Sequence, residues 1–162
     1  MSLPKEYYET VARTIEESGQ FVQCVFDPDD RPGPTGATRN FAYTIGNHRD
    51  GLPELLTIAP NKTFWAMLNV LGAIMRAQER RFEHGERVLL SPASKFPVMV
   101  IDVDLDLVRR DYTVQAGQLW QTEDYDVQQV LYPDKNGKFP HEPGYDWWEQ
   151  TLLNISPIPM LQ

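Results

Sequence analysis

Sixteen residues near the C-terminus, Leu131 to Asp146, restrict the fold more than any other stretch of the chain. They contain three prolines, two glycines and interleaved aromatic residues. A regular helix or a central strand cannot form here, because proline lacks the N–H donor and fixes φ while glycine adds backbone freedom. Such a segment is ordered only where its rings pack against other parts of the protein. We therefore expect a structured lid that covers part of a sheet.

The composition is that of an ordinary globular protein, with 41% hydrophobic and 23% charged residues in 162. The longest uncharged apolar run, Trp65 to Ile74, is far shorter than the roughly 20 residues that span a bilayer. No N-terminal stretch pairs a basic region with an apolar one, so a secretory signal is not expected. We expect a cytoplasmic protein that does not enter the membrane.

The formal net charge of −8 argues against nucleic-acid binding, because contacts with phosphates need clustered Lys and Arg. The charge is concentrated between residues 121 and 149, where seven acids and two lysines give −5. This acidic region predicts a solvated face, and a cationic protein partner is the functional alternative. The seven acids are Glu123, Asp124, Asp126, Asp134, Glu142, Asp146 and Glu149.

Cys24 is the one cysteine of the sequence and lies in an apolar run, so an internal disulfide is excluded. We expect a buried, unreactive thiol rather than a nucleophile.

The first half of the chain predicts one helix followed by three strands. Pro4 suits the first turn of a helix that Ser18-Gly19 ends, and residues 21–26 are β-prone. Residues 27–40 read as a long polar loop that is a candidate for mobility. Residues 41–45 and 55–59 predict an antiparallel hairpin around the turn-forming residues 46–51.

The second half opens with the clearest helix, which Asn61 can cap. Its apolar positions recur at helical spacing, and Arg76 to Arg81 place cations near its C-terminus. Short strands are predicted at 87–90 and 127–132, a stronger one at 98–103, and a short helix near 114–119. The apolar stripe consists of Phe64, Met67, Leu68, Leu71, Ile74 and Met75.

Beyond Ile101 apolar and acidic residues alternate, which predicts an extended segment with one face in water. Asp102, Asp104 and Asp106 lie on that face. They lack the glycine turn and the distant bidentate Glu of a calcium loop, so we interpret them as solvated.

Together these elements predict a single α+β domain: a curved, mainly antiparallel sheet of five to seven strands with two main helices. We divide it into an N-terminal helix, a core and a C-terminal extension, at 1–17, 18–146 and 147–162.

No recognisable catalytic or cofactor motif is present: the sequence lacks a dinucleotide-binding glycine pattern, a phosphate loop and a nucleophile elbow. His48, His84 and His141 do not show the spacing of metal ligands, so we predict neither a metal nor a cofactor.

A looser constellation suggests a small-molecule pocket between residues 43–50 and residues 132–146. In the alternative interpretation, Asp134 and Asn136-Gly137 only build a tight turn, while Tyr145 and Trp148 fill a small core. The candidate pocket residues are Tyr43, Thr44, His48, Asp50, Tyr132, Asp134, Lys138, His141, Glu142, Tyr145 and Asp146.

Several short motifs follow one another in a fixed order: Phe41-Ala-Tyr-Thr-Ile-Gly46, Leu52-Pro-Glu-Leu-Leu56, Leu68-Asn69, Phe82-x-x-Gly85-Glu86, Tyr132-Pro-Asp134, Gly137-x-Phe-Pro140 and Pro143-Gly-Tyr-Asp146. Over roughly residues 18–146 they resemble a bacterial family, the domain of unknown function 4262. Two residues depart from its usual pattern: Leu52 stands where the family has His, and Tyr132 where it has Trp. The resemblance implies a cytosolic bacterial domain without an assigned activity, and it transfers no catalytic residue.

Two functional hypotheses follow. The first is a non-enzymatic binding domain, for example of an accessory or immunity type, that engages a cationic protein partner. The second is an enzyme or sensor in which His48 or His141 acts as acid or base and Asp134 or Glu142 orients it.

Overall fold

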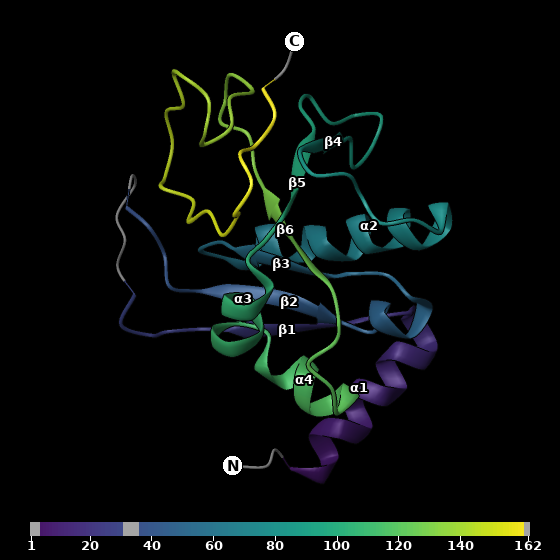
Figure 1. Cartoon of the computed structure of the whole chain (residues 1–162). Helices are drawn as coiled ribbons and strands as arrows, with labels where there is room; N and C mark the ends of the chain where they lie inside the picture. Colours follow the sequence, from purple (N-terminus) through teal and green to yellow (C-terminus); the bar gives the residue numbers. More distant parts are fainter. Residues whose placement is uncertain (1–3, 31–35, 161–162) are drawn as a thin grey trace.

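The structure, a computed structural model, describes residues 4–30 and 36–160. In these residues it contains six strands, four α-helices and one short 3-10 helix (Figure 1). Their bounds are α1 Lys5–Ser18, β1 Phe21–Val25, β2 Phe41–Ile45, η1 Asn47–Asp50, β3 Glu54–Ile58, α2 Lys62–Gln78, β4 Glu86–Val88, β5 Val98–Asp102, α3 Leu105–Asp111, α4 Val114–Trp120 and β6 Val127–Leu131.

The strands form one open, mixed sheet in the order β1-β2-β3-β6-β5-β4. Four of its five pairings are antiparallel, and the pairing at its centre, between β3 and β6, is parallel. The predicted hairpin of β2 and β3 is confirmed. The prediction of a mainly antiparallel sheet with two main helices is thus only partly borne out, since the sheet is mixed and α3 and α4 join α1 and α2.

The parallel pair arises because the chain leaves β3 and crosses through α2, β4, β5, α3 and α4 before it returns as β6. Glu54 is registered with Val127 and Leu56 with Gln129. Both strands therefore point the same way, and whatever precedes β3 lies at the opposite end of the sheet from whatever follows β6.

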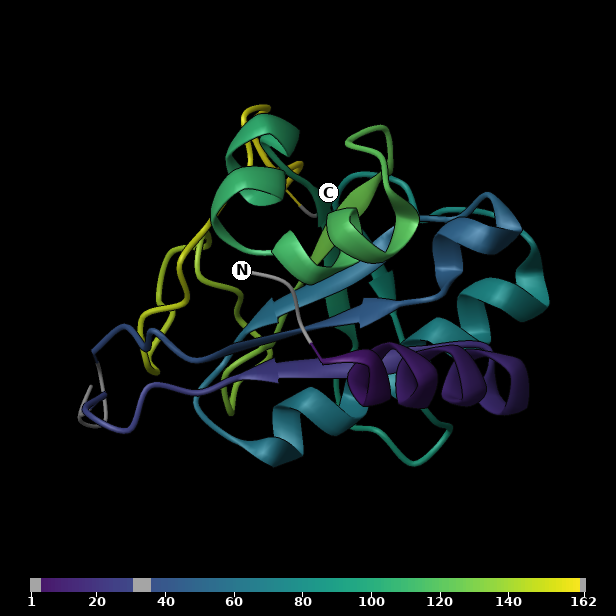
Figure 2. The ribbon, with the colours of Figure 1, turned by 90° about the horizontal axis from the view of Figure 1, so that it is seen from below.

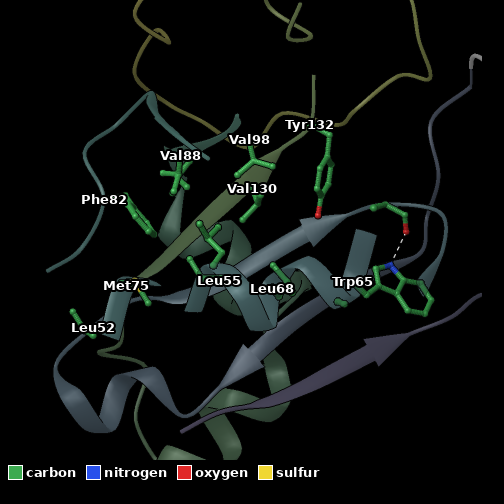
Figure 3. Close-up of a cluster of buried hydrophobic side chains, with 14 of the residues drawn as sticks. Leu52, Leu55, Trp65, Leu68, Met75, Phe82, Val88, Val98, Val130 and Tyr132 are labelled. Carbon is green, nitrogen blue, oxygen red and sulfur yellow. Dashed lines mark hydrogen bonds between the residues drawn. The ribbon is translucent and has the colours of Figure 1, made fainter. Parts of the chain in front are cut away.

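The helices lie on the two faces of the sheet (Figure 2). On one face α2 packs over β2 and β3 with Leu68, Leu71 and Met75 buried, and Figure 3 shows this cluster with Leu55 and Val130 of the sheet. On the other face, residues of α1, α3 and α4 share a second cluster with β2 and β3. A third, smaller cluster joins β5 and β6 to the C-terminal segment.

Local signals explain the ends of both long helices. The Asn61 side chain accepts a hydrogen bond from the Thr63 N–H at 3.0 Å and begins α2 as predicted. Gly19 ends α1 in the left-handed conformation, with φ of 88°. The indole of Trp65 donates to the Ala59 carbonyl at 2.9 Å and fixes the approach of α2 to β3 (Figure 3).

Two expectations about the strands are wrong. The extended segment does not run past Asp102, because the Asp104 carboxylate accepts the Leu107 N–H and begins α3, with Asp106 in its first turn. Aspartate is a strong N-cap, so the alternation marks a helix start. Cys24 is exposed instead of buried, since β1 is an edge strand.

The long loop expected at residues 27–40 is described at 27–30 and 36–40, and its centre lies outside the described residues. In the described part, Asn40 accepts the Asp27 N–H at 2.7 Å and joins the two ends of the loop. No helix of the described chain is long and apolar enough to cross a membrane.

Candidate functional site

The predicted pocket residues fall into two groups at opposite ends of the sheet (Figure 1). Thr44 lies near the end of β2, and His48 and Asp50 lie in η1 before β3, whereas the residues from Tyr132 onward follow β6. The parallel pairing of β3 and β6 separates the groups. The structure therefore does not bring residues 43–50 and 132–146 together around one pocket.

The turn at the first group is built around the buried carboxylate of Glu54, which is fully inaccessible to solvent. Only donors surround it. Its Oε1 accepts from the Thr44 hydroxyl at 2.8 Å and the Asn47 N–H at 3.1 Å, and its Oε2 accepts from the Gly46 N–H at 3.0 Å, the His48 N–H at 3.2 Å and the Trp120 indole at 3.1 Å.

A chain of hydrogen-bonded polar side chains connects Glu54 to the cation Arg76. The Asn47 amide donates to Thr44 at 3.1 Å, and its oxygen accepts from Arg76 at 2.6 Å. Arg76 also donates to Gln20 at 2.7 Å. The relay carboxylate–hydroxyl–amide–guanidinium balances a buried negative charge without direct contact between the two ions.

Burial raises the pKa of Glu54 above its ordinary value, and the N–H and O–H donors act in the opposite direction. Because no part of the carboxylate reaches solvent, Glu54 cannot contact a ligand. It fixes the β2–β3 turn instead. Sequence reasoning missed Glu54, Gln20 and Arg76; the signal was a single acid at the start of an otherwise uncharged strand.

The remaining residues of the first group do not form a reaction centre. Tyr43 is buried on the face of α4, where its hydroxyl donates to the Gln115 side chain. The half-buried His48 ring lies beside two aromatic rings. Its centroid is 5.3 Å from that of Trp120 and 6.4 Å from that of Tyr125. Asp50 is exposed, so the group offers an aromatic-packed imidazole without a carboxylate bonded to its ring.

The second group is a rigid segment organised by Asp134. One carboxylate oxygen accepts the N–H groups of Asn136 and Lys138 at 2.8 and 2.9 Å, and the other accepts that of Asp146 at 2.8 Å. Burial would raise the pKa of Asp134, but these N–H groups lower it. Asp134 thus ties both ends of residues 134–146 together, which agrees with the turn-forming interpretation.

Glu142 and Phe139 fasten the same segment to the sheet. Phe139 is fully buried against Met99 and Leu131. Glu142 accepts the Phe139 N–H at 2.9 Å and pairs with Arg87 at 3.2 Å, and the Arg87 guanidinium lies 4.8 Å from the centre of the Phe139 ring. Burial alone would raise the pKa of Glu142, but these contacts lower it below its ordinary value. Lys138 is exposed.

The two other aromatic candidates of the segment are also structural. The Tyr132 hydroxyl donates to the Phe64 carbonyl at 3.0 Å, on the α2 face of the sheet. The Tyr145 hydroxyl donates to the Trp148 carbonyl. Both ring nitrogens of His141 are buried without a partner among the described residues, and burial lowers the pKa of His141.

The accessible features of this end of the molecule surround Trp147, which is 41% exposed. Trp147 lines two depressions, one of about 530 Å³ and one of about 340 Å³. The first is lined by Pro140, Tyr145, Trp147, Glu149, Gln150, Thr151 and Leu152, and the second by Pro133, Asp134, Lys135, Asp146 and Trp147. We call these two depressions and the indole that they share the Trp147 surface.

The sequence matches one known protein family. The profile of the domain of unknown function 4262 (DUF4262) matches residues 14–146, most of the chain. The chain belongs to this family. No curated protein and no solved structure shows significant similarity to it.

The residues that carry the DUF4262 resemblance have structural roles in this chain. Gly46 has φ of 143°, and a Cβ there would lie 2.6 Å from the Gly19 carbonyl oxygen. Leu52 is buried in the α2 cluster. With Glu54 and Asp134 these residues shape two turns of this chain.

The seven acids predicted as one face are also divided. Asp134 is buried, Glu142 pairs with Arg87, and Asp126 pairs with Arg81 at 2.8 Å. Four acids form no ion pair in the described chain. They lie at opposite ends of β6: Glu123 and Asp124 before it, and Asp146 and Glu149 after it.

Proposed function

We propose that this DUF4262 member is a binding domain that engages a cationic protein partner through the Trp147 surface. The observation that carries the proposal is the combination of an exposed indole with two unpaired carboxylates, Asp146 and Glu149, on a segment that is otherwise held rigidly. We further propose that it acts in the cytoplasm as a non-enzymatic accessory protein, and the unpaired thiol of Cys24 suits a reducing compartment.

An exposed tryptophan next to an apolar neighbour favours a protein interface. Trp147 is 41% and Leu152 36% exposed, and both line the larger depression. Tryptophan is enriched among the residues that contribute most to binding, typically at least 2 kcal/mol each. Apolar patches bordered by polar groups often mark interaction sites.

The rigidity of the segment supports the same function. Asp134 ties residue 146 back to the start of the segment, and Gln150 bonds both the N–H and the carbonyl of Tyr132, at 2.9 and 2.7 Å. Trp147 lies between these two anchor points. A surface that is ordered before binding loses little conformational entropy when the partner docks.

The negative charge of the Trp147 surface favours a positively charged partner. The Trp147 surface carries Asp146 and Glu149, whereas Trp120, which precedes the acids at the other end of β6, is half-buried and donates its indole N–H to Glu54. Opposite charge on the partner accelerates association and excludes acidic competitors. The small-molecule alternative has weaker support, because its predicted residues lie at two ends of the sheet and the depressions found are open.

The test is retention of host proteins on the immobilised chain at low salt and at about 1 M salt, where exposed charges are screened within about 3 Å. We expect a basic protein that is retained at low salt and released at high salt. Trp147→Ala should weaken retention about 30-fold, as expected for a loss of 2 kcal/mol, whereas Phe26→Ala, which removes an aromatic ring that is 63% exposed elsewhere, should not. Retention that is equal for Trp147→Ala and the wild type would contradict the proposal.

A further inference from the structure

We infer that the larger depression of the Trp147 surface binds the guanidinium group of an arginine side chain. This inference rests on the proposed function and names the chemical group that the partner presents. Arginine stacks its plane on the Trp147 indole and pairs its N–H groups with the Glu149 carboxylate.

The free hydrogen-bonding groups of the depression select a cation. The Gln150 side chain is already bonded to the Tyr132 main chain, and the Tyr145 hydroxyl donates to the Trp148 carbonyl and accepts from Gln150 at 3.1 Å. The Thr151 carbonyl accepts from Gln129. Glu149 is the charged lining residue, and it has neither an ion pair nor a side-chain hydrogen bond within the described chain.

The two depressions differ in charge, which decides between them. In the smaller one Asp134 already accepts three main-chain N–H groups, and the cation Lys135 lines the wall together with Asp146. Attraction for a further cation is therefore reduced there. In the larger one none of the described lining residues is cationic, so Glu149 acts without compensation.

The shape and the aromatic wall favour arginine over lysine. Tyr145, Trp147 and Glu149 all line one open depression of about 530 Å³, so two aromatic residues and a carboxylate share its wall. A guanidinium stacks on an aromatic face while its edge pairs with a carboxylate, and it is less strongly hydrated than an ammonium group. Lysine approaches the same carboxylate only as a strongly hydrated point charge.

The test uses three small probes with blocked termini: Nα-acetyl-arginine methylamide, its citrulline isostere and its lysine counterpart. Binding is followed by NMR through the indole N–H signals, and the Trp147 signal is assigned by its loss in Trp147→Phe. We expect the arginine probe to shift the Trp147 signal and to bind about 3- to 30-fold more tightly than the citrulline probe, which lacks the charge.

Charge reversal gives the matched control. Glu149→Lys should abolish the preference for arginine over citrulline, while Glu123→Lys, the same change at the other end of β6, should leave it intact. Equal affinity for arginine and citrulline, equal affinity for arginine and lysine, or a preference that survives Glu149→Lys would each overturn the inference.

The outcomes also separate this inference from the proposed function. A host partner that is lost with Trp147→Ala, together with equal binding of arginine and citrulline, would leave the function in place and refute the arginine site. A clear arginine preference without any retained host protein would support the site and refute the function.

Discussion

Replacing Glu54 by glutamine tests whether the β2–β3 turn depends on a carboxylate that only accepts hydrogen bonds. Two donors reach Oε1 and three reach Oε2, all between 2.8 and 3.2 Å. A glutamine amide has one oxygen, so at best three donors keep their acceptor and two face an NH₂ group. The Thr44 hydroxyl cannot compensate, because it already accepts from Asn47 and from the Leu55 N–H.

Each buried donor without a partner costs about 1–3 kcal/mol, which gives about 2–6 kcal/mol for two. Removing the buried charge also lifts a desolvation cost, since burial raises the pKa of Glu54. We therefore expect Glu54→Gln to lower the free energy of unfolding by about 2–4 kcal/mol, within the lower part of that range. For a chain of this size the melting temperature should fall by about 4–16 °C.

The assay is urea unfolding followed by circular dichroism, with thermal unfolding beside it. Glu17→Gln is the control, because it removes the same charge from an exposed position of α1 and should change stability by no more than about 0.5 kcal/mol. If Glu54→Gln unfolds within that margin of the wild type, the donors do not stabilise the carboxylate and our account of the turn is refuted.

Three further predictions concern the α2 cluster and the C-terminal segment. Leu71→Ala should lower the free energy of unfolding by about 2–5 kcal/mol, because the fully packed side chain leaves a cavity; urea unfolding measures it. Gly144→Val should cost about 1–2 kcal/mol, since φ is 86° and no described atom lies within 4 Å of the added Cβ, so backbone strain is the main cost; thermal unfolding measures it. Asp134 and Glu142 have lowered pKa values in the folded state, so their stabilisation is present at neutral pH and is lost as the pH falls below about 4. Pepsin should then cleave residues 134–146 first.

Each of these has its own internal comparison. Val70→Ala, one residue away on the exposed side of α2, should leave stability nearly unchanged, and an equal effect of both alanine variants would mean that the buried face of α2 is misassigned. Gly144→Ala should cost less than Gly144→Val, because a β-branched side chain suits positive φ worst. Pepsin cleavage that begins elsewhere would show that these two carboxylates do not control the segment.

Local patterns predicted the local structure well. The apolar repeat and the Asn61 cap defined α2, because both signals depend on neighbours within one or two turns. The aspartates after β5 were predicted wrongly, because aspartate occurs both on the solvent-facing side of a strand and at the start of a helix. The alternating pattern favoured a strand, whereas the Asp104 carboxylate accepts the Leu107 N–H and begins α3.

Long-range pairing was the part that sequence reasoning could not supply. Nothing near β3 or β6 states that they are parallel neighbours, since the strands are separated by more than sixty residues. Because of that one pairing, the residues of the predicted pocket do not come together. The pairing placed Thr44 and His48 at one end of the sheet and Asp134 and His141 at the other.

The family match ends just before the residues that we propose for partner binding. The profile ends at residue 146, and it includes Glu54 and Asp134, whose carboxylates organise the two turns. Trp147 and Glu149 follow immediately after that boundary. The two residues that organise these turns therefore lie within the matched range, while the residues that we propose for recognition lie on the stretch that follows it. Because Asp134 accepts the N–H of residue 146, this contact fixes the start of that stretch through its main chain and does not involve the side chains of Trp147 and Glu149.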